Sequence, residues 1–164
     1  YRIASSSERL VGIAFGAEDF VTNMHTSRSK PGTELFTARQ EILLAARAAG
    51  LHAVDTVFSD ISDDEGFRKE VELIKNMGYD GKSVINPRQV GIVHSIYMPS
   101  VDEIKTARKI IRAIEKAEAE GSGVVAVDGK MIDKPVVDRA RHTLELAQAS
   151  GIYLDEIEEE DINA

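Results

Sequence analysis

The 164-residue sequence contains no cysteine and no tryptophan, and only 5% of its residues are aromatic. Without cysteine there is no disulfide framework, no thiolate nucleophile and no cysteine-based zinc site. No apolar run approaches the roughly 20 residues of a transmembrane helix, and the first residues lack the basic-then-apolar pattern of a signal peptide. We therefore expect a cytoplasmic protein that does not act at a membrane.

The net charge of −8 argues against binding to nucleic acid. Much of this charge is local, since six acidic residues lie near the end of the sequence: Asp155, Glu156, Glu158, Glu159, Glu160 and Asp161. Without them, 20 basic residues stand against 22 acidic ones. We interpret this acidic segment as a solvated end. The apolar content of 43% is ordinary for a globular protein with one core.

The first hundred residues alternate apolar runs with amphipathic segments. Strands are predicted over residues 10–15, 53–58 and 83–85, and helices over residues 34–49, 64–77 and 87–96. A capping box, Ser62 to Glu65, opens the second of these helices, and Gly78 closes it. Strands that alternate with helices across short connections favour βαβ units and a parallel sheet.

The pattern changes after Pro99. A long amphipathic helix is predicted over residues 101–119, then a strand over residues 124–127 and a last helix that ends near residue 149. We therefore expect two parts, residues 1–99 with the α/β pattern and residues 100–164 as an appended C-terminal part.

The segment Gly16–Phe20, with the sequence Gly-Ala-Glu-Asp-Phe, directly follows the first predicted strand. Small residues allow a close approach to a ligand, and a carboxylate at the end of a buried parallel strand is able to bind Mg²⁺. The alternative is a capped strand end with two solvated acids. Asp55 ends the second predicted strand at the same edge, where it supports such a site or serves the fold alone.

Arg28 and Lys30 follow this acidic segment in a polar loop. Two interpretations remain open: contact with an anionic thioester carrier, or a solvated loop, which we favour.

Three strands do not close a parallel barrel, which takes eight strands and about 250 residues. The sequence also opens at Tyr1 without an initiator methionine. We therefore expect the C-terminal portion of a longer protein.

Six short segments, taken together and in this order, resemble the family of citrate lyase beta subunits, which belongs to a superfamily of Mg²⁺-dependent acyl-thioester lyases and aldolases. The resemblance runs from about residue 8 to about residue 149. The segments are residues 16–20, 38–39, 45–50, 80–83, 86–89 and 128–133.

The resemblance implies the last three strands of a (β/α)8 TIM barrel, followed by a helical extension with a lid motif. It places Asp19 as a metal ligand for Mg²⁺, and Gly16 and Ala17 as the substrate-binding residues that lie against a keto acid. Asp133 matches the catalytic acid that relatives supply from a C-terminal lid. A further metal-binding Glu and an Arg for substrate carboxylates would lie in an absent half. Asn86, where many relatives have His, resembles the citrate lyase branch.

The implied reaction is the Mg²⁺-dependent cleavage of a citryl thioester into oxaloacetate and an acetyl thioester. The implied partners are an acyl-carrier protein or CoA as thioester carrier, the other citrate lyase subunits and further copies of this chain. Two alternatives remain open. The first is a malyl-type acyl-CoA lyase of the same superfamily. The second is a catalytically incomplete fragment that associates with itself through its open sheet edges.

Overall fold

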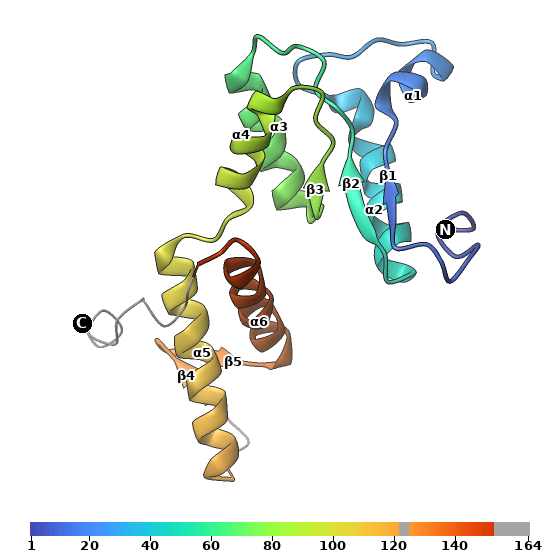
Figure 1. Cartoon of the computed structure of the whole chain (residues 1–164). Helices are drawn as coiled ribbons and strands as arrows, with labels where there is room; N and C mark the ends of the chain where they lie inside the picture. The colour runs from blue at the N-terminus through green and yellow to red at the C-terminus, as the bar shows by residue number, and fades with distance from the viewer. Residues whose placement is uncertain (122–124, 153–164) are drawn as a thin grey trace. The chain divides into compact units, whose positions relative to one another are not determined.

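The computed structural model of the chain describes residues 1–121 and 125–152 (Figure 1). Its contacts divide the chain into two compact units, one formed by Tyr1–Tyr97 and a second that begins at Met98. Each unit contains its own β-sheet. None of the helices in the described ranges has the length and apolarity needed to cross a membrane.

The first unit alternates short strands with helices. Its strands are β1 (Gly12–Ala14), β2 (His52–Asp55) and β3 (Gly81–Lys82). Its helices are α1 (Ala17–Asn23), the 3₁₀ turn η1 (Thr33–Leu35), α2 (Phe36–Ala48), α3 (Asp64–Met77) and α4 (Pro87–Tyr97). The strands form a parallel sheet in the order β1-β2-β3. The predicted parallel α/β arrangement is confirmed for this unit, as an open three-stranded sheet.

The third strand lies two residues earlier than predicted. It was expected over residues 83–85, but β3 is formed by Gly81–Lys82. The ladder ends where the backbone N–H of Ser83 donates to Asp55 O at 2.9 Å. The backbone N–H groups of Ile85 and Asn86 instead donate to Gln89 Oε1 in α4, at 3.0 and 3.2 Å. The apolar residues after Ser83 therefore lead into α4 instead of extending the sheet.

The core of the first unit lies between the sheet and two helices, α2 and α3, which both pack behind the sheet in the view of Figure 1. Its buried members are Ala4, Leu43, Ala46, Leu51, Ala53, Ile74 and Tyr79. A smaller cluster joins α1 to η1 through Phe15, Ala17, Val21 and Leu35. The second cluster seats the start of α1 against the end of β1.

Helix α3 has the predicted length but a different N-terminal cap. The backbone N–H of Gly66 donates to Asp63 Oδ1 at 2.8 Å, so Asp63 is the N-cap. The Ser62 hydroxyl instead donates to Asp60 Oδ1 at 2.6 Å, so the predicted Ser62–Glu65 capping box is wrong. The predicted end is confirmed, because Gly78 adopts a left-handed conformation with φ of 105°.

The second unit is built from two helices, α5 (Val101–Ala119) and α6 (Lys134–Ala149), which pack against each other. Between them lies an antiparallel hairpin of β4 (Val125–Val127) and β5 (Lys130–Ile132). Asp128 and Gly129 make its turn with φ of 51° and 74°, which is the backbone that a two-residue hairpin loop requires. The predicted strand start at residue 124 and the acidic segment lie outside the described residues.

Asp80 ties three segments together at the amino end of the sheet. Its carboxylate accepts two hydrogen bonds from the Arg47 guanidinium, at 2.9 and 3.0 Å, and one from the backbone N–H of Ala53, at 2.7 Å. Arg47 also donates to Gly78 O at 2.5 Å. Partial burial alone would raise the pKa of Asp80, but the hydrogen bonds from Arg47 and Ala53 outweigh it and lower that pKa.

We expect this carboxylate to make stability pH-dependent in acid. Because its pKa is lowered on folding, its contribution is complete above the unfolded value of about 3.9 and is lost as the pH falls through the folded value. Asp80→Asn removes this acid-dependent part, and Asp80→Ala costs about 2 kcal/mol near neutral pH. Urea unfolding between pH 2 and 7 tests this. If the free energy of unfolding of Asp80→Asn fell in acid as much as that of the unchanged protein, the expectation would be contradicted.

Candidate active site

Polar side chains gather where the three parallel strands end. Asp55 is the last residue of β2 and lies in register with Lys82, the last residue of β3. Helix α1 begins three residues after the end of β1. Carboxyl ends of parallel strands share one edge of a sheet, and this is the edge at which α/β proteins carry their sites.

Asp55 is the centre of a buried ion network. Its carboxylate accepts from Arg39 Nε and Nη2, both at 2.9 Å, and from Lys82 Nζ at 2.8 Å. The side-chain exposures are 1% for Arg39 and 0% for Asp55 and Lys82. Burial alone would lower the pKa of Arg39, but its hydrogen bonds with Asp55 and the charges of Asp55 and Glu70 raise it.

Glu70 of α3 completes this network. Its Oε1 accepts from Lys82 Nζ at 2.5 Å and lies 3.3 Å from Arg39 Nη2. A third hydrogen bond joins Lys82 Nζ to Thr56 O at 2.8 Å. An ammonium group has three donors, and all three of Lys82 are occupied. Lys82 therefore acts as a buried structural cation, and its amine is not available to attack a carbonyl group.

Tyr79 supports the network by holding the backbone of Arg39 in α2. Its hydroxyl donates to the backbone carbonyl of Arg39 at 2.8 Å. Burial, with the nearby charge of Asp55, raises the pKa of Tyr79 to about 12. The hydroxyl therefore stays protonated and keeps donating to α2 throughout the physiological pH range.

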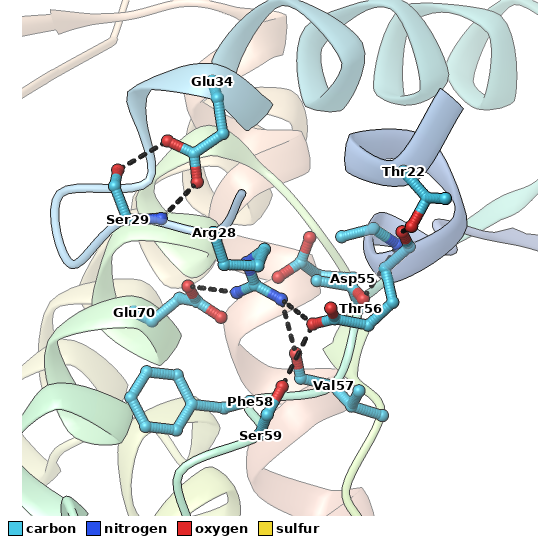
Figure 2. A network of polar contacts seen from close by, with 12 residues as sticks. Thr22, Arg28, Ser29, Glu34, Asp55, Thr56, Val57, Phe58, Ser59 and Glu70 are labelled. Carbon is cyan, nitrogen blue, oxygen red and sulfur yellow. Dashed lines mark hydrogen bonds and ion pairs between the residues drawn. The ribbon is translucent and has the colours of Figure 1, made fainter. Parts of the chain in front are cut away.

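Arg28 links the buried network to the acidic segment of α1 (Figure 2). Its Nη2 donates to Glu70 Oε2 at 3.2 Å, and its Nη1 donates to Glu18 Oε1 at 3.1 Å and to Val57 O at 3.3 Å. The Arg28 side chain is only 18% exposed. The interpretation of Arg28 as part of a solvated loop is therefore wrong, whereas Lys30 is exposed as expected.

Asp19 lies exposed in the first turn of α1. Within residues 1–121 and 125–152, its carboxylate takes part in no hydrogen bond or ion pair. A methyl group at Gly16 would lie 3.7 Å from Asp19 Oδ2, so the carboxylate faces the space beside Gly16. The described residues hold no cluster of three or more acidic or histidine side chains suited to a metal ion. Asp19 fits Mg²⁺ as one carboxylate of a larger ligand set.

Gly16 and Ala17 differ in their surroundings. Gly16 is exposed with φ of −96°, so its backbone does not require glycine. Ala17 is completely buried, and its backbone N–H donates to Thr56 Oγ1 at 3.1 Å. Gly16 therefore offers an open surface for a ligand, while Ala17 anchors the start of α1.

Asp133 belongs to the second unit, where it is the N-cap of α6. Its Oδ1 accepts from the backbone N–H of Val136 at 3.1 Å. It is exposed and lines a surface cavity of about 490 Å³ together with Met131, Lys134 and Arg141. The position thus has a structural use that asparagine fulfils as well as aspartate.

Sequence reasoning missed three members of the network: Arg39, Glu70 and Lys82. One signal was present, because Arg39 lies four residues after Leu35 and four before Leu43, which are both buried. A charged residue at that spacing belongs to the buried face of the helix. The sequence left open whether Asp55 supports the site or serves the fold alone; in the structure it is a fully buried member of the network.

The comparisons with known proteins agree with this architecture. A family model described as HpcH/HpaI aldolase/citrate lyase matches residues 1–87. Over 150 residues the chain is 54% identical to the citrate lyase subunit beta of Escherichia coli K12, a match that covers 92% of this chain and 50% of that protein. A (3S)-malyl-CoA thioesterase of Cereibacter sphaeroides is 42% identical over 146 residues, with 88% and 51% covered.

Among solved structures, the chain is similar to CitE of Mycobacterium tuberculosis in complex with magnesium, acetoacetate and coenzyme A. The TM-score is 0.72 at 34% identity, over 89% of this chain and 55% of that one. The chain thus spans about half the length of the curated relatives that it matches. The resemblance inferred from the six sequence segments is confirmed.

We expect the buried network to dominate the stability of the first unit. Asp55→Asn leaves the charges of Arg39 and Lys82 without their shared carboxylate, and removing one partner of a buried pair costs about 3–5 kcal/mol. The matched control is Glu65→Gln, which breaks the exposed pair with Lys69 and changes the free energy of unfolding little. Urea unfolding measures the free energy of unfolding of both variants. An equal loss of stability in Asp55→Asn and Glu65→Gln would contradict the expectation.

Proposed function

Because the chain belongs to the HpcH/HpaI aldolase/citrate lyase family, we propose that it is part of a Mg²⁺-dependent carbon–carbon lyase. Its reaction is the cleavage of a citryl thioester into oxaloacetate and an acetyl thioester. The observation that carries this proposal is the exposed, uncommitted Asp19 carboxylate beside Gly16 at the carboxyl end of β1. The 54% identity to a citrate lyase subunit beta supports the citryl group.

We further propose that the three parallel strands belong to a (β/α)8 barrel. The thioester carrier is an acyl-carrier protein or coenzyme A; the second is bound in the M. tuberculosis CitE complex. Other citrate lyase subunits and further copies of the chain are the proposed protein partners. The 42% identity to a malyl-CoA thioesterase favours a malyl thioester as the second candidate substrate.

The chain's residues take the following roles. Asp19 would hold Mg²⁺, and the bound ion would stabilise negative charge on a substrate oxygen. Gly16 leaves room for the keto acid next to Asp19. A base removes the proton of the citryl hydroxyl, the carbon–carbon bond breaks, and its electron pair moves to the acetyl thioester as an enolate. Asp133 delivers a proton to the enolate carbon, which balances the proton taken from the hydroxyl, so no other reactant is consumed.

Asp19→Asn keeps the size of the side chain but removes the charge that binds the cation. We expect at least about a hundredfold loss of kcat/KM for oxaloacetate release from a citryl thioester by the full-length protein. Omission of Mg²⁺ should abolish turnover of the unchanged protein. If the full-length protein cleaved only a malyl thioester in the presence of Mg²⁺, the assignment would move to the second candidate. No turnover of either substrate would leave the chain as a non-catalytic part.

Asp133 is tested by two substitutions that separate folding from catalysis. Asp133→Asn preserves the helix cap, and Asp133→Ala removes it at a cost of about 1 kcal/mol. We expect both variants to lose turnover, by about a hundredfold or more, because both lack the proton donor. Thermal unfolding measured beside kcat distinguishes the two effects. Full turnover by Asp133→Asn would exclude the proposed role.

A further inference from the structure

Two adjacent carboxylates in the first turn of α1 have different surroundings. Glu18 Oε1 accepts hydrogen bonds from Arg28 Nη1 at 3.1 Å and from Ser59 Oγ at 3.0 Å. Asp19 has no such partner among the described residues. Building on the proposed function, we propose that Arg28 and Ser59 are positioning residues that hold Glu18 at the rim of the sheet. Glu18 thereby orients α1 so that Asp19 alone of the pair binds the cation.

The anchors of this turn converge on one short segment after β2. The backbone N–H of Ala17 donates to Thr56 Oγ1 at 3.1 Å, and the Glu18 carboxylate accepts from Ser59. Arg28 donates to Glu18 and also to Val57 O at 3.3 Å. A helix of seven residues has little stability of its own. Its orientation therefore depends on these contacts with residues 56–59 together with the apolar cluster of Ala17 and Val21.

The geometry of Arg28 suits this role. One terminal nitrogen of its guanidinium reaches α1 and residue 57, while the other reaches Glu70 of the buried network (Figure 2). The planar fork allows both contacts at once, and a lysine ammonium on a flexible stem does not reproduce them. Arg28 thus connects the network around Asp55 to the first turn of α1, beside a second link through Thr56, which accepts from Lys82 Nζ and from the backbone N–H of Ala17.

The test measures Mn²⁺ affinity of the full-length protein by electron paramagnetic resonance of free Mn²⁺. Asp19→Asn should weaken binding about tenfold or more, because it removes a ligand charge. Glu18→Gln keeps an acceptor for Arg28 and Ser59, and should change affinity by no more than about twofold. Glu18→Ala loses the anchor and should weaken binding about fivefold, as should Arg28→Lys, which preserves the charge.

Combining variants separates positioning from stability. In the Glu18→Ala background, Arg28→Lys should cause no further loss of Mn²⁺ affinity, because its influence on the cation passes through Glu18. Its effect on thermal unfolding should persist in that background, because Arg28 still pairs with Glu70. Ser59→Ala should weaken Mn²⁺ binding without lowering the unfolding temperature. A purely structural Arg28 would change stability and leave Mn²⁺ affinity as it was.

Three further results would overturn the proposal. A loss in Glu18→Gln as large as that in Asp19→Asn would make Glu18 a ligand. If Arg28→Lys weakened Mn²⁺ binding equally with and without the Glu18 side chain, Arg28 would not act through Glu18. Unchanged Mn²⁺ affinity in Asp19→Asn would remove the metal site on which the proposal stands. The pattern expected above, in a protein that cleaves no citryl thioester, would support the positioning role while rejecting the proposed reaction.

Discussion

The charge on Asp55 is the constraint on which the first unit depends. A fully buried carboxylate is costly unless countercharges and hydrogen bonds surround it, and Arg39 and Lys82 supply them at 2.8–2.9 Å. These partners come from α2 and β3, and Glu70 adds α3. This network of contacts around Asp55 therefore holds together two strands and two helices, at the edge of the sheet where the candidate site lies.

This arrangement divides the carboxylates at that edge into two groups. Asp55, Glu70 and Glu18 are committed to cations of the fold, and three cations, Arg28, Arg39 and Lys82, balance them. Asp19 remains outside this charge balance and exposed. A charge-balanced network beside one uncommitted carboxylate suits the proposed cation site, because no charged group of the network neutralises Asp19.

The sequence predicted the alternation of strands and helices because each element carries its own periodicity and its own stop signals, such as Gly78. It predicted the acidic segment after β1 for the same reason: small residues followed by acids are a local pattern. The network was not predictable in this way, because Arg39, Glu70 and Lys82 are brought together only by tertiary packing. The end of β3 was misplaced because a side-chain acceptor, Gln89, takes over from the ladder.

The positions proposed for catalysis are those whose residue type the fold does not require. Gly16 has an ordinary φ of −96° and room for a methyl group, in contrast to Gly78 with φ of 105°. Asp133 caps a helix that asparagine would cap equally well. Asp19 is exposed, and its carboxylate makes no hydrogen bond or ion pair in the described part of the chain. The fold accepts other residue types at these three positions, so the roles proposed for Gly16, Asp19 and Asp133 rest on the chemistry of a ligand and not on the needs of folding.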